Sequence, residues 1–254
     1  MLLTVDVGNT NAVMGVFDGD ELVEHWRAAS DPRRTADEWL LLVRQFLAGS
    51  GFPLDDVEGI AVASVVPKVT TNLRRMCERM GRSPLVVDWR TDTGMPVLLD
   101  DPSEAGADRL ANAVAAYDVV RGPVVVVDLG TATTFDVVSG AGEYLGGVIL
   151  PGIEISLDAL FDRAAALRRI DLTPPDRVLG SSTATAVRSG ATFGYAAQID
   201  GLCARLQEEI GSARFIATGG LASVIAPLCQ RVHAHDPWLT LQGLRLIYQR
   251  NYHD

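Results

Sequence analysis

Two short loops in this sequence share an aspartate, a glycine and a preceding apolar run. The first is Asp6–Thr10, which reads DVGNT, and the second is Asp128–Ala132, which reads DLGTA. Shifting the sequence by 122 residues (128 minus 6) superimposes the two aspartates and also the two glycines, Gly8 and Gly130. A glycine turn lets backbone N–H groups approach an anion closely. Two such turns in related halves predict a site that binds a polyphosphate.

The side chains of both loops suit the chemistry of phosphate and metal ions. Asn9 and Thr10 add neutral donors to the first loop, and threonine hydroxyls follow Gly130 in the second. Asp6 is a candidate Mg²⁺ ligand, because Mg²⁺ prefers one or two carboxylates together with phosphate oxygens. A plain hairpin turn is the alternative for either loop alone. The presence of a second copy favours the phosphate site.

A third candidate is the segment Gly106–Arg109, which reads GADR and lies at the start of a predicted helix. Asp108 in the first turn would be stabilised as a carboxylate by the helix dipole. An ionised aspartate beside a hydroxyl can accept its proton during phosphoryl transfer. Arg109 offers a planar fork for a carboxylate. The alternative is ordinary N-terminal capping with a solvated arginine.

Two further turns precede predicted helices. Thr218–Gly220 follows a predicted strand and could bind a phosphate or an adenosine group. The alternative is an ordinary strand-to-helix turn. Gly180–Thr183 opens another helix, in which Thr183 is either the N-cap or a substrate contact. The sequence leaves both alternatives open at each turn.

Composition narrows the class of protein. The 254 residues are 48% apolar and 21% charged, and the formal net charge of −10 argues against nucleic acid or an anionic membrane as partner. Three cysteines without a C-x-x-C motif favour a reduced, cytoplasmic setting, as does the lack of a signal-peptide pattern or a membrane-length apolar run. The single lysine, Lys68, is followed by valine, which excludes a Walker A loop.

The elements that would position these groups form two similar halves. In each half, three short strands separated by tight turns precede helices and further strands. We therefore predict an α/β fold with two lobes, each a mixed sheet flanked by helices, at residues 1–118 and 119–254. The predicted helices cover residues 35–49, 67–81, 107–120, 153–166, 183–210, 221–231 and the segment from 238 onward.

The motifs and their order resemble a known family. The two Asp-x-Gly loops resemble the phosphate motifs of the acetate and sugar kinase, Hsp70 and actin superfamily, which implies two ribonuclease-H-like, actin-like ATPase lobes. The chain is more specifically similar to type III pantothenate kinases in the segments DVGNTNAV, SVVP, GADR, DLGTATTFD, GGVILPG and TGG, and in residues 182–190. GADR between the two phosphate loops is the most specific of these segments.

The resemblance implies ATP-dependent phosphorylation of the 4′-hydroxyl of pantothenate, the first step of coenzyme A synthesis. It also implies Mg²⁺ at Asp6, a monovalent cation (K⁺ or NH₄⁺) at Asp128, Asp108 as the general base, and a homodimer with the active site near the subunit interface. The residues that it assigns to ATP are Asp6, Val7, Gly8, Asn9, Thr10, Asn11, Ala12, Val13 and Thr131. The residues that it assigns to pantothenate are Gly106, Ala107, Asp108, Arg109 and Thr183.

The chain departs from the family's common pattern in two places. Leu99 stands where many relatives have a tyrosine, so a hydrogen bond in the substrate pocket is expected to be missing. Ser181 and Ser182 stand where a Lys-Asn pair commonly precedes the threonine. The first departure bears on substrate affinity more than on the type of reaction.

Two alternative functions stay open. The first is a transcription accessory factor of the same family without catalytic activity, and the second is another kinase of the superfamily that acts on a sugar or on acetate. The intact Asp6, Asp108 and Asp128 favour catalysis over the first alternative. The GADR segment and the small size of the chain argue against the second.

Overall fold

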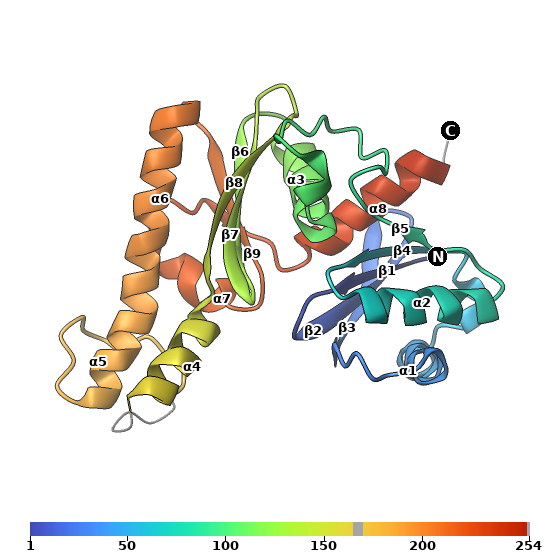
Figure 1. Cartoon of the computed structure of the whole chain (residues 1–254), viewed down its shortest axis with the longest axis horizontal. Helices are drawn as coiled ribbons and strands as arrows, with labels where there is room; N and C mark the ends of the chain where they lie inside the picture. The colour runs from blue at the N-terminus through green and yellow to red at the C-terminus, as the bar shows by residue number, and fades with distance from the viewer. Residues whose placement is uncertain (165–169, 253–254) are drawn as a thin grey trace. The chain divides into compact units, whose positions relative to one another are not determined.

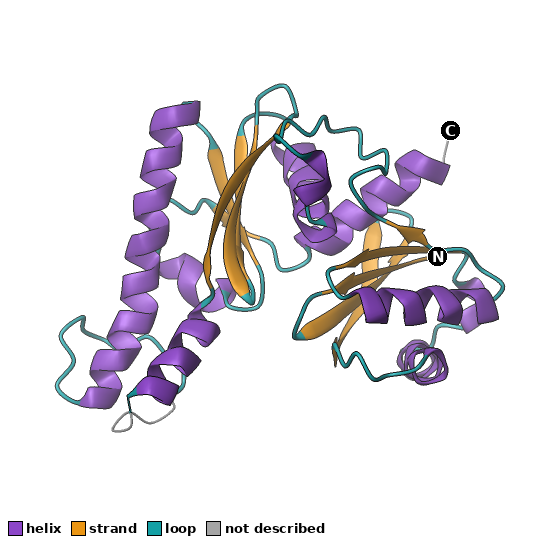
Figure 2. Cartoon of the chain, viewed as in Figure 1, coloured by secondary structure: helices purple, strands orange, loops and turns teal. Residues whose placement is uncertain are grey.

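The computed structural model describes residues 1–164 and 170–252, which form two compact units (Figure 1). Unit 1 comprises Met1–Ala115 and Leu239–Asp254, and unit 2 comprises Ala116–Trp238. Figure 2 shows one sheet with flanking helices in each unit. The predicted α/β class with two mixed sheets is confirmed.

The sheet of unit 1 has five strands in the order β3-β2-β1-β4-β5. The first three strands form an antiparallel meander, and β4 and β5 extend the sheet in parallel with β1. Leu3, Val5 and Val7 of β1 lie in one apolar core, whereas Leu2 packs against the apolar cluster on the other face, so both faces of the sheet are covered. The strands are β1 (Leu2–Val7), β2 (Asn11–Asp18), β3 (Glu21–Ala29), β4 (Gly59–Ser64) and β5 (Leu85–Val86).

Helices cover both faces of this sheet. Thr35 and Glu38 cap each other's backbone at the start of α1, as is typical of a Thr-x-x-Glu sequence before a helix. Trp39 of α1 is fully buried in a core that it shares with Leu3 and Val5 of β1. The helices are α1 (Ala36–Gly49), η1 (Leu54–Asp56), α2 (Pro67–Arg79), η2 (Pro102–Glu104) and α8 (Leu239–Tyr252), and α3 (Ala107–Val120) continues into unit 2.

Unit 2 repeats the sheet topology of unit 1. Its strand order, β8-β7-β6-β9-β10, has the same antiparallel meander followed by two parallel strands. The internal repeat predicted from the two Asp-x-Gly loops is therefore present in the fold. The strands are β6 (Val124–Leu129), β7 (Ala132–Val138), β8 (Tyr144–Pro151), β9 (Arg214–Thr218) and β10 (Ala234–His235).

One helix prediction for unit 2 is confirmed in its bounds and another needs correction. The chain is helical over residues 183–210 as predicted, and a π-helical segment that begins and ends at glycines lies within this stretch. The helix predicted over residues 221–231 is much shorter, because Pro227 lacks a backbone N–H and restricts the residue before it. The helices are α4 (Ile153–Arg163), α5 (Thr183–Ser189), η3 (Gly190–Gly194), α6 (Tyr195–Ile210), α7 (Ala222–Ile225) and η4 (Ala226–Leu228). Residues 165 and 166 of one predicted helix lie outside the described residues.

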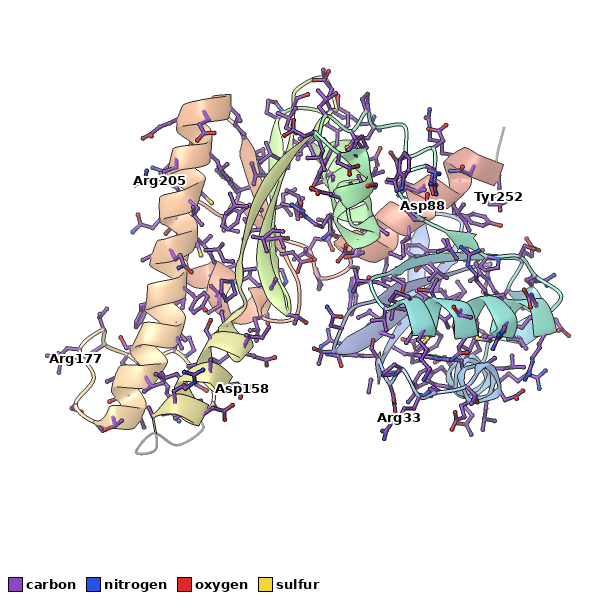
Figure 3. All side chains as sticks on the ribbon, in the orientation of Figure 1. Arg33, Asp88, Asp158, Arg177, Arg205 and Tyr252 are labelled. Atoms are coloured by element: carbon purple, nitrogen blue, oxygen red, sulfur yellow. The ribbon has the colours of Figure 1, made fainter. Side chains whose placement is uncertain are left out.

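Helix α6 covers one face of the second sheet. Ile199 and Cys203 of α6 pack with Val125 and Val127 of β6 in a single apolar core. Arg205 is exposed and projects away from the sheet (Figure 3). The odd-numbered side chains of β6 thus face α6, and its even-numbered side chains, Asp128 among them, point to the other face.

The last helix packs on the sheet of unit 1, although it follows the sheet of unit 2 in sequence. Leu244 and Ile247 of α8 share an apolar cluster with Ala61 and Ala63 of β4. This division differs from the predicted second lobe of residues 119–254. Apolar spacing identifies the buried face of a helix but does not identify the sheet that buries it.

The contact of α8 with α3 leads to a stability prediction. A Cβ on Gly243 of α8 would overlap the backbone of Ala111 in α3. We therefore expect Gly243→Ala to lower the free energy of unfolding by about 1–3 kcal/mol through overpacking. Urea denaturation measures this change. Gly201→Ala in α6 is the control, because nothing lies within 4 Å of its new Cβ, and it should raise stability by up to about 1 kcal/mol. Equal effects in both variants would contradict the close packing of α8.

Candidate active site

The first Asp-x-Gly loop connects β1 to β2 in unit 1. The N–H of Gly8 donates to the carbonyl oxygen of Asn11 at 3.0 Å, and the N–H of Ser30 donates to the carbonyl oxygen of Thr10 at 3.0 Å. These bonds hold the backbone of the turn, while the side chains of Asn9 and Thr10 stay exposed. An anion that approaches the turn therefore meets polar groups on a fixed backbone.

The GADR segment forms the first turn of α3. Oδ1 of Asp108 accepts the backbone N–H of Arg109 at 2.9 Å, and both residues are half-buried. A Cβ on Gly106 would lie 2.6 Å from the same Oδ1, so the glycine makes room for the carboxylate. Negative charge is favourable in the first turn of a helix. The local structure thus suits an aspartate that keeps one oxygen anchored to the backbone.

Asp6 and the GADR turn belong to one face of the unit 1 sheet. Asp6 pairs with Ala63 of the parallel strand β4, so both side chains point to the same side. Ala63 lies in the apolar cluster that also contains Ala107 and Ala111 of α3. The fold therefore brings the start of α3 to the face that carries Asp6, although 102 positions (108 minus 6) separate the two aspartates. Asp6 of the phosphate-type turn and the helix start that carries the candidate proton acceptor thus lie on the same side of the unit 1 sheet.

The second Asp-x-Gly loop connects β6 to β7 in unit 2. The N–H of Gly130 donates to the carbonyl oxygen of Ala132 at 3.0 Å, and Thr131 is exposed. Asp128 is half-buried near the end of β6 and pairs with Thr134 of β7. Asp6 pairs with Val13, seven positions later, whereas Asp128 pairs with Thr134, six positions later. The second loop is therefore one residue shorter than the first.

Two glycines from other segments pack against the second loop. Gly219, which follows β9, has φ +91°, and a Cβ there would overlap Oδ1 of Asp128 and lie 2.7 Å from the backbone of Leu129. A Cβ on Gly152 would lie 2.7 Å from the backbone carbonyl carbon of Thr131. Thr218–Gly220 is therefore more than a strand-to-helix turn, because its glycine shapes the surroundings of Asp128. Sequence reasoning identified this turn but did not predict that contact.

Substitution of Gly219 tests this close approach. We expect Gly219→Ala to displace the Asp128 carboxylate as well as to strain the backbone, so its cost should exceed the roughly 1–3 kcal/mol of backbone strain alone. Gly51→Ala is the control, because Gly51 has a similar φ of +82° and nothing within 4 Å of a Cβ. Thermal unfolding of both variants measures the difference. A loss in Gly219→Ala no larger than in Gly51→Ala would contradict the contact with Asp128.

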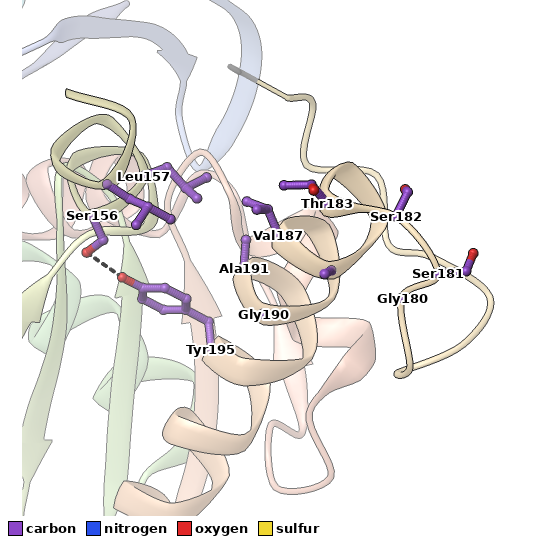
Figure 4. A pocket seen from close by; sticks show the side chains of 12 residues that line it. Ser156, Leu157, Gly180, Ser181, Ser182, Thr183, Val187, Gly190, Ala191 and Tyr195 are labelled. Atoms are coloured by element: carbon purple, nitrogen blue, oxygen red, sulfur yellow. Dashed lines mark hydrogen bonds between the residues drawn. The ribbon is translucent and has the colours of Figure 1, made fainter. Parts of the chain in front are cut away.

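Thr183 lines a pocket of about 870 Å³ in unit 2, between α4 and α5. Figure 4 shows Thr183 and Val187 of α5 pointing toward Leu157 of α4. The N-cap of α5 is Ser182, whose side chain accepts the N–H of Thr185. Of the two roles that the sequence left open for Thr183, the N-cap is taken by Ser182, and contact with a substrate stays a prediction.

The same pocket contains polar groups that sequence reasoning missed. Oη of Tyr195 donates to Oγ of Ser156 at 2.6 Å, a bond that joins the start of α6 to α4 (Figure 4). Neither residue stood out in the sequence, because each lies within an otherwise ordinary helical pattern. The remaining lining side chains near the pair are mostly apolar or small. The pocket thus combines an apolar wall with a few hydroxyl groups.

The cysteines do not supply a nucleophile. Burial raises the pKa of Cys77, Cys203 and Cys229 to about 12 in each case, so these thiols are protonated at neutral pH.

Among the described residues, no group of three or more His, Cys, Asp or Glu side chains is arranged to hold a metal ion. A cation at either loop would therefore take fewer than three of these side chains, together with hydroxyl, backbone or substrate oxygens. No helix in the described part of the chain is long and apolar enough to cross a membrane.

Comparison with known proteins identifies the family. The sequence model of type III pantothenate kinase matches residues 2–205. The chain belongs to the type III pantothenate kinase family. Type III pantothenate kinases from Moorella thermoacetica and Myxococcus xanthus are each 49% identical to it, covering 99% of this chain and 100% and 99% of their own lengths. The type III pantothenate kinase from Frankia alni is 50% identical, covering 99% of this chain and all of its own.

Solved structures confirm the fold of this type III pantothenate kinase. A putative Baf family transcriptional activator from Campylobacter jejuni superimposes with a TM-score of 0.59 at 21% identity, over 98% of both chains. A putative N-acetylmannosamine kinase from Listeria monocytogenes has the same TM-score at 15% identity, over 98% of this chain and 99% of its own. At these identities the likeness concerns the two-lobed α/β kinase fold alone.

The predicted site residues of the kinase fall into two groups by unit. Asp6–Val13 and Gly106–Arg109 lie in unit 1, where Asp6 and the start of α3 lie on the same side of the sheet. Asp128, Thr131 and Thr183 lie in unit 2, the first two near one turn and the third on the separate helix α5. Each unit thus contains one Asp-x-Gly turn and one further polar segment.

Proposed function

We propose that this chain transfers the γ-phosphoryl group of ATP to the 4′-hydroxyl of pantothenate, the first step of coenzyme A synthesis. The observation that carries the proposal is the placement of the GADR turn on the sheet face of Asp6. Phosphoryl transfer needs a phosphate-binding turn and a nearby group that orients the acceptor hydroxyl. Membership of the type III pantothenate kinase family supports pantothenate as the acceptor.

The two Asp-x-Gly loops are the proposed ATP-binding segments. Asp6–Val13 binds phosphates through the turn at Gly8 and its exposed polar side chains, and Thr131 adds a hydroxyl from the second loop. Asp6 would hold Mg²⁺, because a carboxylate at the end of a strand beside a phosphate-binding turn is a fitting oxygen ligand. Mg²⁺ supplies neutralisation of the charge that develops on the phosphate oxygens.

Asp108 is the proposed general base. Its Oδ1 is engaged by the N–H of Arg109, and a carboxylate has a second oxygen that can accept the proton of the 4′-hydroxyl. The guanidinium of Arg109 would bind the carboxylate of pantothenate. Gly106 and Ala107 are also proposed to belong to the pantothenate-binding segment, and Thr183, which is exposed, would donate a hydrogen bond to the substrate.

Asp128 is the proposed ligand of a monovalent cation, K⁺ or NH₄⁺. Its carboxylate lies against the backbone of Gly219 and opposite the hydroxyl-bearing Thr134, and such a set of oxygen donors fits a large monovalent ion. With Lys68 as the sole lysine of the chain, positive charge near the phosphates must come from cations, backbone dipoles or arginine. K⁺ supplies part of that charge when it is bound.

A homodimer in the cytoplasm is the proposed state of the enzyme. Apolar side chains are exposed on the edge strand β8 and on the following helix α4, among them Ile149 at 64% and Ile155 at 48%. Exposed apolar patches of this kind often mark subunit interfaces. Sedimentation velocity should therefore give twice the chain mass, and a monomer at micromolar concentration would contradict this assignment.

A ligand-dependent thermal shift tests the proposed function against both alternatives. ATP with Mg²⁺ and pantothenate should raise the melting temperature above the value with either ligand alone, because each binds the folded protein. Glucose or acetate should add nothing to the shift with ATP. Stabilisation by a sugar or acetate would favour another kinase activity. Absence of any shift with pantothenate would favour a regulatory role.

A further inference from the structure

A buried carboxylate with no role in the proposed reaction lies on strand β7 in unit 2. Asp136 is 0% exposed. Its Oδ1 accepts the phenol O–H of Tyr144 at 2.7 Å, and its Oδ2 accepts the hydroxyl of Thr134 at 3.2 Å. A fully buried carboxylate is costly to desolvate, so its presence in the core calls for a reason beyond packing.

The repeat within the fold argues that this carboxylate is not needed to form the sheet. In unit 2, Asp128 pairs with Thr134, and two residues further along Val126 pairs with Asp136. The same ladder in unit 1 pairs Asp6 with Val13 and Thr4 with Gly15. Thr134 and Asp136 thus correspond to a valine and a glycine in a sheet of identical topology. The polar pair is specific to the lobe that carries Asp128.

The hydrogen bond from Thr134 to Asp136 determines the direction in which the hydroxyl proton of Thr134 points. A threonine hydroxyl has one proton and two lone pairs, and here the proton points to Asp136. The side of Oγ1 that faces away from Asp136 can therefore only accept. Asp128, the residue paired with Thr134, extends its side chain on the same face of the sheet, with Cβ atoms about 4.5–5.5 Å apart.

We infer that Asp136 is a positioning residue for the monovalent cation. By holding the proton of Thr134, Asp136 presents the Thr134 oxygen as a second ligand beside the Asp128 carboxylate. Two acceptor oxygens side by side attract a cation, whereas a hydroxyl proton turned toward Asp128 would repel it. This inference rests on the proposed cation site at Asp128 and adds a ligand, Thr134, and the residue that orients it.

Asp136→Asn is the variant that tests the inference, because an amide of the same shape would donate N–H to Thr134 and reverse its hydroxyl. The readout is the melting temperature of the full chain with Mg²⁺ and a non-hydrolysable ATP analogue, titrated with KCl against NaCl at equal ionic strength. Asp136→Asn should weaken apparent K⁺ affinity by about 10–100-fold, the usual effect of losing a group that orients a metal ligand.

Three matched variants separate cation binding from packing. Thr134→Val removes the oxygen and should lose the K⁺ response, whereas Thr134→Ser keeps the hydroxyl and should retain it. Tyr144→Phe removes the hydrogen bond from Tyr144 to Asp136 without changing Thr134, so it should keep the K⁺ response even if it lowers stability. If Asp136→Asn does not fold, the comparison of Thr134→Val with Thr134→Ser decides the question.

The outcomes distinguish failure of the inference from failure of the proposed function. Equal melting temperatures of the unaltered chain in K⁺ and Na⁺ would overturn the cation site at Asp128, and the inference with it. A K⁺-specific shift that survives in both Asp136→Asn and Thr134→Val would leave the cation site standing and overturn the role of Asp136. An equal loss of K⁺ response in Tyr144→Phe would also overturn it, because the effect would then be one of packing.

Discussion

Replacing Asp108 with Asn should lower kcat by about a hundred- to ten-thousand-fold, the usual contribution of a general acid or base. The asparagine keeps an oxygen that can accept the N–H of Arg109, so the start of α3 should hold its shape. Binding of ATP should be nearly unchanged, because Asp108 is proposed to act on the acceptor hydroxyl. Steady-state kinetics and ATP-analogue titration measure the two quantities separately.

The control for this variant removes a neighbouring charge without touching the proposed base. Glu104, two residues before Gly106, is exposed, and Glu104→Gln should leave kcat close to that of the unaltered enzyme. Loss of the first-turn charge in Asp108→Asn should cost about 0.3–1 kcal/mol of stability, too little to unfold the protein. A kcat near the unaltered value in Asp108→Asn would remove Asp108 from the role of base.

Replacing Asp128 with Ala should abolish the difference in activity between K⁺ and Na⁺. This carboxylate lies against Gly219 and opposite Thr134, and without it the proposed cation site loses its charged ligand. Loss of a cation that stabilises phosphate charge is worth several kcal/mol in the transition state. Activity with ATP and pantothenate should therefore fall in K⁺ buffer toward the level in Na⁺ buffer.

Asp128→Asn separates charge from shape at this position. The amide has nearly the volume of the carboxylate and keeps one oxygen, so the contact with Gly219 should survive while the attraction for a cation weakens. Its K⁺ response should lie between those of the unaltered enzyme and Asp128→Ala. An undiminished preference for K⁺ in Asp128→Ala would place the cation elsewhere.

Much of the fold follows from local signals in the sequence. The paired Asp-x-Gly loops predicted the repeat, and both sheets have the same strand order. The helix predicted over residues 35–49 agrees with α1, whose N-cap is Thr35. These features depend on spacing over a few residues, which a single sequence displays directly.

The structure adds what depends on contacts between distant segments. The sequence pattern predicted that α8 is a helix. It did not indicate that Leu244 of this helix would pack against β4 of the first sheet. The π-helical interruption at Gly190–Gly194 was missed because the apolar pattern continues through it. In the site, Gly219 was identified as part of a turn, whereas its contact with Asp128 depends on β9 lying beside β6.

The sequence predicted which residues belong to the candidate site, but it did not predict how they are arranged. Asp6 and GADR could be named from the sequence, but their common sheet face depends on the pairing of β1 with β4. Thr183 could be named as well, yet the capping of α5 by Ser182 decides that its hydroxyl is available to the pocket. Residue types indicate the chemistry, and tertiary pairing determines which groups share a surface.

The most direct test of the proposed function is ADP release with ATP and Mg²⁺, measured with and without pantothenate, in K⁺ buffer and in Na⁺ buffer of equal ionic strength. The chain should turn over only when pantothenate is present and should do so much faster in K⁺. Such a result would establish both the acceptor and the cation requirement. Folded protein that releases no ADP in response to pantothenate in either buffer would contradict the proposed kinase activity.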